Sequence, residues 1–129
     1  MKMKRWAWAA LAVVLAVSLV GCGEAPMTDS AKVEQTVRNL AQALVDGNAA
    51  RAAELSNGTV DYWKTIFALA DFTGYKVDNL VITISGSQAT AVFMATVETV
   101  VLGRPQTDVT AITWRLFKSG DQWKVDVMS

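Results

Sequence analysis

The sequence predicts an α+β domain in which about three N-terminal helices cover one face of a four-stranded antiparallel meander, giving a cone-like shape. Apolar residues recur at helical spacing between residues 33 and 69, whereas residues 75–128 alternate between apolar and polar side chains. The alternating stretches are rich in Val, Ile and Thr and are separated by short turns, which is typical of hairpins. A chain of 129 residues has room for one such domain.

Three segments have helical patterns. The first is expected to begin after an N-cap at Asp29 or Ser30 and to end near Gly47, which suits the left-handed C-terminal position. One face of this helix carries the apolar residues Val33, Val37, Leu40, Ala41, Leu44 and Val45. A short Ala-rich helix is expected over 49–55, and a third helix over 60–70 with a wide, partly aromatic face.

Four strands are expected over 75–85, 88–102, 107–118 and 122–128, with turns at 86–87, 103–106 and 119–120. If each hairpin pairs symmetrically about its turn, Leu80 faces Phe93, Phe93 faces Leu116, and Leu116 faces Trp123. These registers place the large apolar residues on one face, and a slip by one residue would invert a whole strand. The helices should therefore cover that face.

The N-terminal segment has the pattern of a signal peptide. Lys2, Lys4 and Arg5 precede an apolar stretch of about 15 residues, which is shorter than the ~20 residues that a membrane-spanning helix needs. The following residues, Leu19-Val20-Gly21-Cys22, resemble a bacterial lipobox with Cys22 as the acylated residue. An uncleaved anchor and an ordinary secretory peptide are the alternatives.

This interpretation divides the chain into a signal peptide over 1–21, a lipidated Cys22 and tether over 22–29, and a single α+β domain over 30–129. The protein would be exported and anchored to the membrane of the bacterial cell envelope by lipid on Cys22. Gly23 stands where Asp commonly marks inner-membrane retention in enteric lipoproteins. In a Gram-negative host this favours the outer membrane, facing the periplasm.

Composition argues against several classes of function. Once the three cations of the leader are removed, 9 basic residues stand against 12 acidic ones, a net charge of −3, which argues against a nucleic-acid partner. The chain contains no His, so the commonest general base and the most frequent transition-metal ligand are missing. We therefore expect no cofactor and no metal site.

The face of the sheet turned away from the helices is expected to be partly apolar. It should carry Val81, Val92, Met94, Val100, Val109 and Phe117 among polar residues. That is more apolar surface than a monomer usually exposes. A homodimer, or an envelope protein partner docked on this outer sheet face, is therefore an expected interaction.

Two stretches resemble the nuclear transport factor two-like superfamily of cone-shaped α+β domains, and within it small bacterial lipoproteins of unknown function. They are the turn Leu44-Val45-Asp46-Gly47-Asn48-Ala49-Ala50-Arg51-Ala52-Ala53 and the hairpin Lys118-Ser119-Gly120-Asp121-Gln122-Trp123-Lys124-Val125. The resemblance spans about residues 30–128. It implies a pocket between sheet and helices, in which ketosteroid isomerase-like and polyketide cyclase-like relatives place an Asp base or a Tyr donor.

Asp108 and Tyr62 are the residues that such a catalytic role would use. Asp108 is expected on the helix-covered face opposite Val101, and Tyr62 on the third helix. Both residues also have a non-catalytic interpretation: Asp108 as a carboxylate near solvent at the start of a strand, and Tyr62 as an aromatic residue on the face of a helix. The sequence therefore favours a lipid-anchored, non-enzymatic module that binds an apolar small ligand or a protein partner. The alternative is a small lyase or isomerase that acts through Asp108 and Tyr62.

Overall fold

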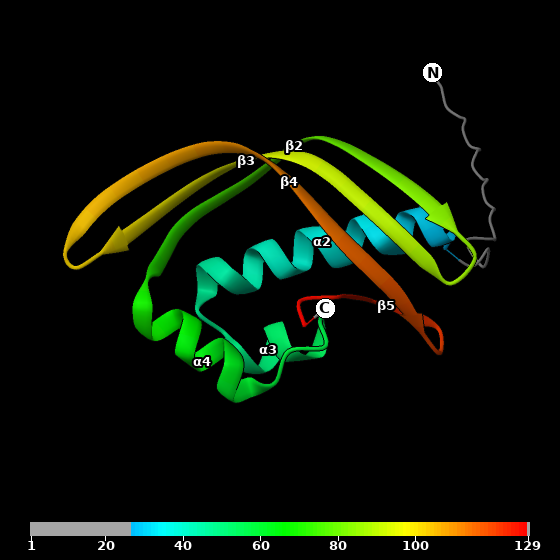
Figure 1. The fold of residues 1–129 in the computed structure, drawn as a ribbon, viewed down its shortest axis with the longest axis horizontal. Coiled ribbons are helices and arrows are strands. Elements are labelled where there is room, and N and C mark those ends of the chain that lie inside the picture. The colour runs from blue at the N-terminus through cyan, green and yellow to red at the C-terminus, as the bar shows by residue number, and fades with distance from the viewer. Residues whose placement is uncertain (1–26, 129) are drawn as a thin grey trace, which may run out of the picture.

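The structure, a computed structural model, describes residues 27–128 (Figure 1). Three helices come first: α2 over Asp29–Asp46, α3 over Ala49–Glu54 and α4 over Val60–Leu69. Four strands follow: β2 over Asp71–Ser85, β3 over Gln88–Val101, β4 over Arg104–Ser119 and β5 over Gln122–Val125. Figure 1 shows the strands as an arched sheet with the helices beneath its concave face. This architecture confirms the predicted fold class.

The helix boundaries follow from local capping. The side-chain oxygen of Thr28 accepts a hydrogen bond from the backbone N–H of Ala31, so the N-cap lies before the predicted Asp29 or Ser30. Gly47 ends α2 with a φ of 64°, as its sequence position predicted. Asn48 and Thr59 cap α3 and α4 in the way that Thr28 caps α2.

The sheet is an antiparallel meander in the order β2-β3-β4-β5. Between β2 and β3 the predicted pairs of Ile82 with Ala91 and Ile84 with Ala89 are present. Nearer the start of β2 the ladder is interrupted by Asn79, which has a φ of 55°. Leu80 therefore lies in a bulge, and its predicted pairing with Phe93 is absent from the regular ladder.

The predicted register between β3 and β4 was wrong by four residues. Phe93 pairs with Ile112, where Leu116 was expected. The cause is the turn: it consists of Leu102 and Gly103 alone, with φ values of 53° and 78°, and strand pairing resumes at Arg104. Such a two-residue turn with two positive φ values matches the twist of a hairpin. Because the shift is even, every side chain remains on its predicted face.

The register between β4 and β5 was also wrong, by two residues. Leu116 pairs with Val125 and Lys118 with Trp123, because the turn consists of Gly120 and Asp121. The strand ends at Val125 and does not continue to Met128. From there the chain bonds to the α3–α4 connection: the N–H of Val125 donates to the carbonyl of Leu55, and the N–H of Asn57 donates to the carbonyl of Val125.

The core lies between α2 and the concave face of the sheet. Three of the concave residues of β3 are small, namely Ala89, Ala91 and Ala95, and all three are buried. Their size lets Val33, Val37 and Leu40 of α2 approach the sheet, and these residues are fully buried. The larger residues Phe93 and Leu116 fill the space beside the helix.

Candidate functional site

The outer, convex face of the sheet carries a group of exposed apolar side chains. Val81 is 60% exposed, Val92 43%, Met94 37% and Val109 65%. Val81 pairs with Val92, and Met94 pairs with Ala111, so these residues are neighbours across three strands. We call Val81, Val92, Met94, Val109 and Ala111 the outer apolar patch. Val100 and Phe117, which were also predicted on this face, are only partly exposed.

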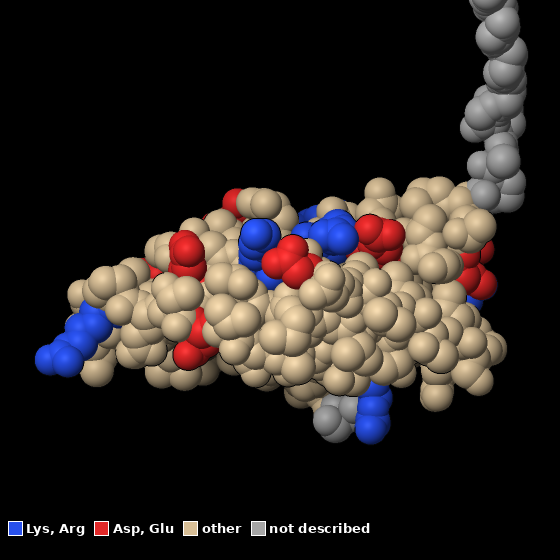
Figure 2. All heavy atoms as spheres, turned by 90° about the horizontal axis from the view of Figure 1, so that it is seen from above, with Lys and Arg blue, Asp and Glu red and all other residues tan. Residues whose placement is uncertain are grey.

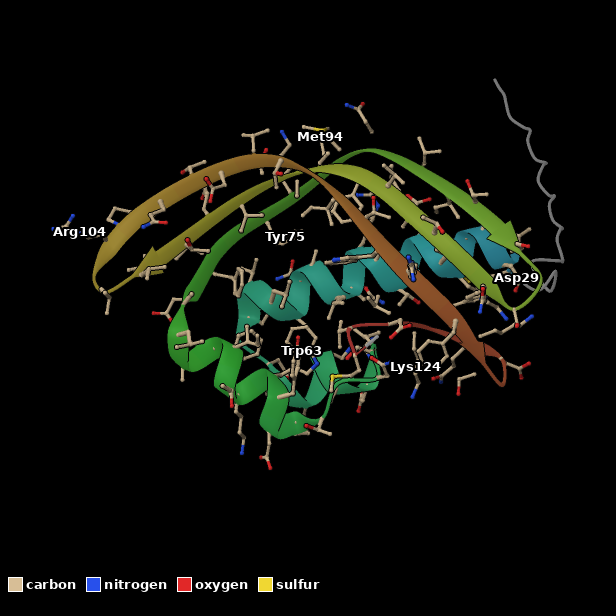
Figure 3. All side chains as sticks on the ribbon, viewed as in Figure 1. Asp29, Trp63, Tyr75, Met94, Arg104 and Lys124 are labelled. Carbon is tan, nitrogen blue, oxygen red and sulfur yellow. The ribbon has the colours of Figure 1, made fainter. Side chains whose placement is uncertain are left out.

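Charged side chains border this patch. Figure 2 looks onto the outer face and shows charges of both signs near its middle, further charges toward its ends, and uncharged side chains between them. Lys76 and Asp78 are successive side chains on this side of β2. They form an exposed ion pair, with 3.9 Å between Nζ of Lys76 and Oδ2 of Asp78. Figure 3 shows Met94 pointing away from the sheet, on the side opposite to the helices. The patch is therefore an apolar surface with charged neighbours.

The concave face holds a series of aromatic side chains in mutual contact. Tyr75 stacks on Trp114 at 6.0 Å between ring centroids, and Trp114 meets Phe93 edge to face at 5.1 Å. Figure 3 shows Tyr75 beneath the sheet, on the side of α2. Burial raises the pKa of Tyr75 to about 12, so its hydroxyl stays neutral near pH 7. The bulge at Asn79 places Tyr75 on the concave face, and it left no clear signal in the sequence.

The other two tryptophans of residues 27–128 belong to the core. Trp63 and Trp123 are buried, and each indole N–H has a partner. Nε1 of Trp63 donates to Oγ of Ser56 at 3.0 Å, and Nε1 of Trp123 donates to the carboxylate of Asp29 at 3.1 Å. Both are therefore structural residues of the core whose indole N–H groups have hydrogen-bond acceptors.

The structure places the two candidate catalytic residues in different surroundings. Asp108 lies on the concave side of β4, paired with Val97 and not with Val101, and its side chain is exposed. Tyr62 lies in the first turn of α4 and is half-buried. Its ring meets that of Trp63 edge to face, with 5.2 Å between the ring centroids. Asp108 belongs to the first part of β4, residues 104–111, in which every residue is exposed. Asp108 therefore lies on an exposed stretch of strand and not in an enclosed pocket.

Neither Asp108 nor Tyr62 lines any of the following three hollows of the described surface. The first is a groove of about 550 Å³ between α2, α3 and the β4–β5 hairpin, with a polar wall that includes Lys32, Gln35, Asn39, Arg51, Gln122 and Lys124. The second, of about 800 Å³, lies between the α2–α3 turn and α4. The third, of about 280 Å³, lies beside Thr90 and Arg115.

The polar groove was missed by sequence analysis because its residues come from three separate segments and form no motif. Part of its polar surface is already bonded internally. Lys32 donates through Nζ to the carbonyl of Asp121 at 3.2 Å, and Arg51 forms an ion pair with Glu54 at 3.1 Å. Its charges are therefore mixed, and part of them is already neutralised within the groove.

Two further observations concern only residues 27–128. These residues contain no group of three or more Cys, Asp or Glu side chains placed to hold a metal ion. None of their helices is both long and apolar enough to cross a membrane. Cys22, the predicted acylation site, lies outside the described residues.

Comparison of the sequence with protein-family models and with curated proteins finds no match. Solved structures do match. An NTF2-like protein from Cytophaga hutchinsonii superposes with a TM-score of 0.65 over 77% of this chain and 93% of its own, at 10% identity. An NTF2-like protein of unknown function in nutrient uptake from Rhodospirillum rubrum gives a TM-score of 0.58 over 76% and 93%, at 19% identity.

The CamKII hub homology domain of Chlamydamonas reinhardtii gives a TM-score of 0.61 over 77% of this chain and 94% of its own, at 16% identity. At these identities the likeness concerns the fold alone. It agrees with what the residues build by themselves, which is three helices beneath an arched antiparallel sheet. The chain therefore has the NTF2-like fold.

Proposed function

We propose that this chain is a lipid-anchored, non-enzymatic interaction module of the bacterial cell envelope, and that it associates with a second copy of itself through the outer face of its sheet. The observation that carries the proposal is the outer apolar patch, which lies on three neighbouring strands. Burying one Val or Met side chain completely is worth about 1.5–3 kcal/mol, so joining two such patches gives a useful driving force.

A second copy is the occupant that best fits this surface. In a two-fold contact the same patch meets itself, so the apolar residues of both copies are covered together. The patch has both Lys76 and Asp78 beside it, so a two-fold related copy can offer an opposite charge to each of them. The solved structure named as a hub homology domain has the same fold, which supports assembly as a role for this architecture.

The anchor is supported by the sequence Leu19-Val20-Gly21-Cys22, which follows a short apolar stretch with a basic start. Acyl chains on Cys22 would hold the domain at a membrane surface, where copies meet more often than in free solution. The absence of His and the exposed position of Asp108 favour binding over catalysis. A lyase or isomerase that uses Asp108 and Tyr62 remains the alternative from another functional class.

The proposal is tested on the full chain, expressed in a bacterium and purified in detergent, with its protein mass measured by light scattering. The variant Met94→Lys places a charge in the centre of the patch on the central strand β3. Met128→Lys is the matched control, because it makes the same change at an exposed Met outside the patch. We expect Met94→Lys to reduce the average mass, whereas Met128→Lys keeps the wild-type mass. Equal masses for all three proteins would overturn the proposed association.

A further inference from the structure

The outer edge of β4 is open over most of its length. On this side β5 pairs only with residues 116–119 of β4, and the carbonyl of Arg115 accepts a hydrogen bond of 2.8 Å from the N–H of Asp126. From Arg104 to Trp114, no described strand pairs with this edge. An unpaired strand edge presents a row of N–H and C=O groups that can pair with another strand.

The direction of these backbone groups follows from the hydrogen bonds on either side. The carbonyl of Arg115 points toward β5, whereas the N–H of Lys118 donates to Ser87 of the β2–β3 turn, on the other side of the strand. In an antiparallel ladder, alternate residues direct both groups to the same side. Four residues of the open stretch therefore direct their N–H and C=O groups outward, namely Thr107, Val109, Ala111 and Thr113.

The other edge of the sheet is protected, and the edge of β4 is not. β2 has two interruptions of its ladder, and it carries Lys76 and Asp78 at its exposed middle. Bulges and charges of this kind discourage pairing with another chain. β4 pairs with β3 without interruption, and Asp108 is the single charged residue from 105 to 114. Its side chain lies on the concave face, away from the outward-directed backbone groups.

We propose that this open edge pairs with the same edge of a second copy, in antiparallel orientation and centred on Val109. The sheet would then continue through both molecules. Val109 would face its own equivalent, and Thr107 would face Ala111 of the second copy. Each such pair exchanges two N–H···O bonds.

The two ends of the open stretch determine where the pairing is centred. Val109 is midway between Gly103, in the hairpin turn, and Arg115, where the chain's own Asp126 occupies the edge. A centre at Asp108 would place two carboxylates directly opposite each other, which is unfavourable. A centre at Thr110 would bring the strand of the second copy against Asp126. With Val109 at the centre, the turn of the second copy ends where β5 begins to cover β4.

This contact goes beyond the proposed function, because it uses the backbone edge of β4, whereas the outer apolar patch is a set of side chains on the convex face, Val109 and Ala111 among them. Two distinct two-fold contacts on one chain produce a closed tetramer or a longer assembly. The edge contact itself does not depend on the patch. The larger assembly rests on the proposed association through the outer face.

The test replaces one outward-directed N–H. In Ala111→Pro the N–H that is lost points to the open edge, so no bond to β3 is removed and the strand tolerates the change. Ala111→Thr is the matched control, because it keeps the N–H and suits a strand. Both are measured as full chains in detergent, alone and combined with Met94→Lys.

If both contacts form, we expect the wild-type protein to be a tetramer or larger, and Ala111→Pro and Met94→Lys each to be dimers. The double variant should be a monomer, and Ala111→Thr should match the wild type. If Ala111→Pro has the wild-type mass, the edge pairing is wrong, whatever Met94→Lys does. If Met94→Lys alone has the wild-type mass, the outer-face association is wrong and the edge pairing is judged by Ala111→Pro.

A second measurement covers the case in which Ala111→Pro does not fold. Thr110→Cys, in the Met94→Lys background, places a thiol on the concave side next to the proposed centre, where the equivalent residue is a diagonal neighbour across the contact, about 7–8 Å away. A short bis-maleimide should crosslink this variant into dimers. Gln42→Cys in the same background, at an exposed position of α2, is the control and should not be crosslinked. Equal crosslinking of the two variants would contradict the edge pairing.

Discussion

The indole Nε1 of Trp123 donates a hydrogen bond of 3.1 Å to Oδ1 of Asp29, which joins the last hairpin to the first turn of α2. Nζ of Lys118 lies 3.2 Å from the same oxygen atom. These two contacts hold the pKa of Asp29 below its ordinary value of 3.8. The first helix and the last strand are thus connected through one carboxylate.

We expect Asp29→Asn to lower the thermal unfolding temperature at pH 7, because the charge that Trp123 and Lys118 contact is lost. Since the pKa of Asp29 is lowered in the folded state, its contribution is present above 3.8 and is lost as the pH falls through the folded-state pKa. The two proteins should therefore differ at pH 7 and converge near pH 2. A difference that is the same at both pH values would show that the carboxylate charge is not the cause.

Ser56 is a buried hydroxyl with three partners. It donates to the carbonyl of Ala52 at 2.7 Å and accepts from Nε1 of Trp63 and from the N–H of Gly58. Ser56→Ala leaves two buried donors without an acceptor, and we expect it to lower the free energy of unfolding by about 2–3 kcal/mol in urea denaturation. Ser119→Ala, at an exposed position beside the β4–β5 turn, should change it by less than about 0.5 kcal/mol. Equal effects would contradict the role of this hydroxyl.

Phe93 and Val92 are adjacent residues of β3 on opposite faces of the sheet. Phe93 is buried against Trp114, whereas Val92 lies in the outer apolar patch. Phe93→Ala should destabilise the protein by about 3–5 kcal/mol because it leaves a cavity. Val92→Ala should cost less than about 1 kcal/mol, a value typical of strand propensity. The reverse order would mean that the register of β3 is wrong.

Leu102 holds a φ of 53° in the β3–β4 turn, while its side chain is 95% exposed. A residue that tolerates this conformation better should relieve strain without losing a contact. We expect Leu102→Asn, which creates an Asn-Gly turn, to raise the free energy of unfolding by roughly 0.5–1 kcal/mol. Gly103→Ala, at a φ of 78°, should have the opposite sign. Urea titration of both variants checks this, and an unchanged or lower stability of Leu102→Asn would contradict it.

Cys22→Ala should abolish acylation of the chain expressed in a bacterium, because the variant has no thiol left to accept a lipid. The wild type should incorporate labelled palmitate and fractionate with membranes, whereas the variant should accumulate as an unprocessed and unlabelled precursor. Palmitate incorporation equal to that of the wild type would disprove the assignment of the lipidation site.

The sequence alone predicted the fold class because patterning with periods of two and of three to four residues is a strong local signal. It also placed β4 and β5 on their correct faces, since errors of two or four residues do not change the side on which a residue lies. In β2 the bulge at Asn79 reverses the faces of the residues before it, which the alternation after it could not indicate. The registers themselves depended on where each turn begins. The pattern around Pro105 suggested a four-residue loop, whereas the chain turns at Leu102 and Gly103. Leu at a positive φ is uncommon, so sequence gave no reason to expect it.

The candidate site was predictable in part, for the same reason. The outer apolar patch follows from alternation along β2, β3 and β4, so Val81, Val92 and Met94 could be named in advance. The open edge of β4 could not, because it depends on β5 ending at Val125, where the chain bonds to the α3–α4 connection. That ending is a tertiary effect. Asp108 was placed on the correct face, but its exposure depends on how far β4 extends beyond the helices.

The bonds from the last hairpin to the start of α2 also determine how the domain bears a mechanical load. Asp29 is bonded to Trp123 and Lys118, and Lys32, one turn later, donates to the carbonyl of Asp121. A pulling force applied through the residues before α2 is therefore shared by the β4–β5 hairpin, which is itself paired to the sheet. Force enters the domain where the start of α2 is bonded to this hairpin, so α2 is protected from being peeled away one turn at a time.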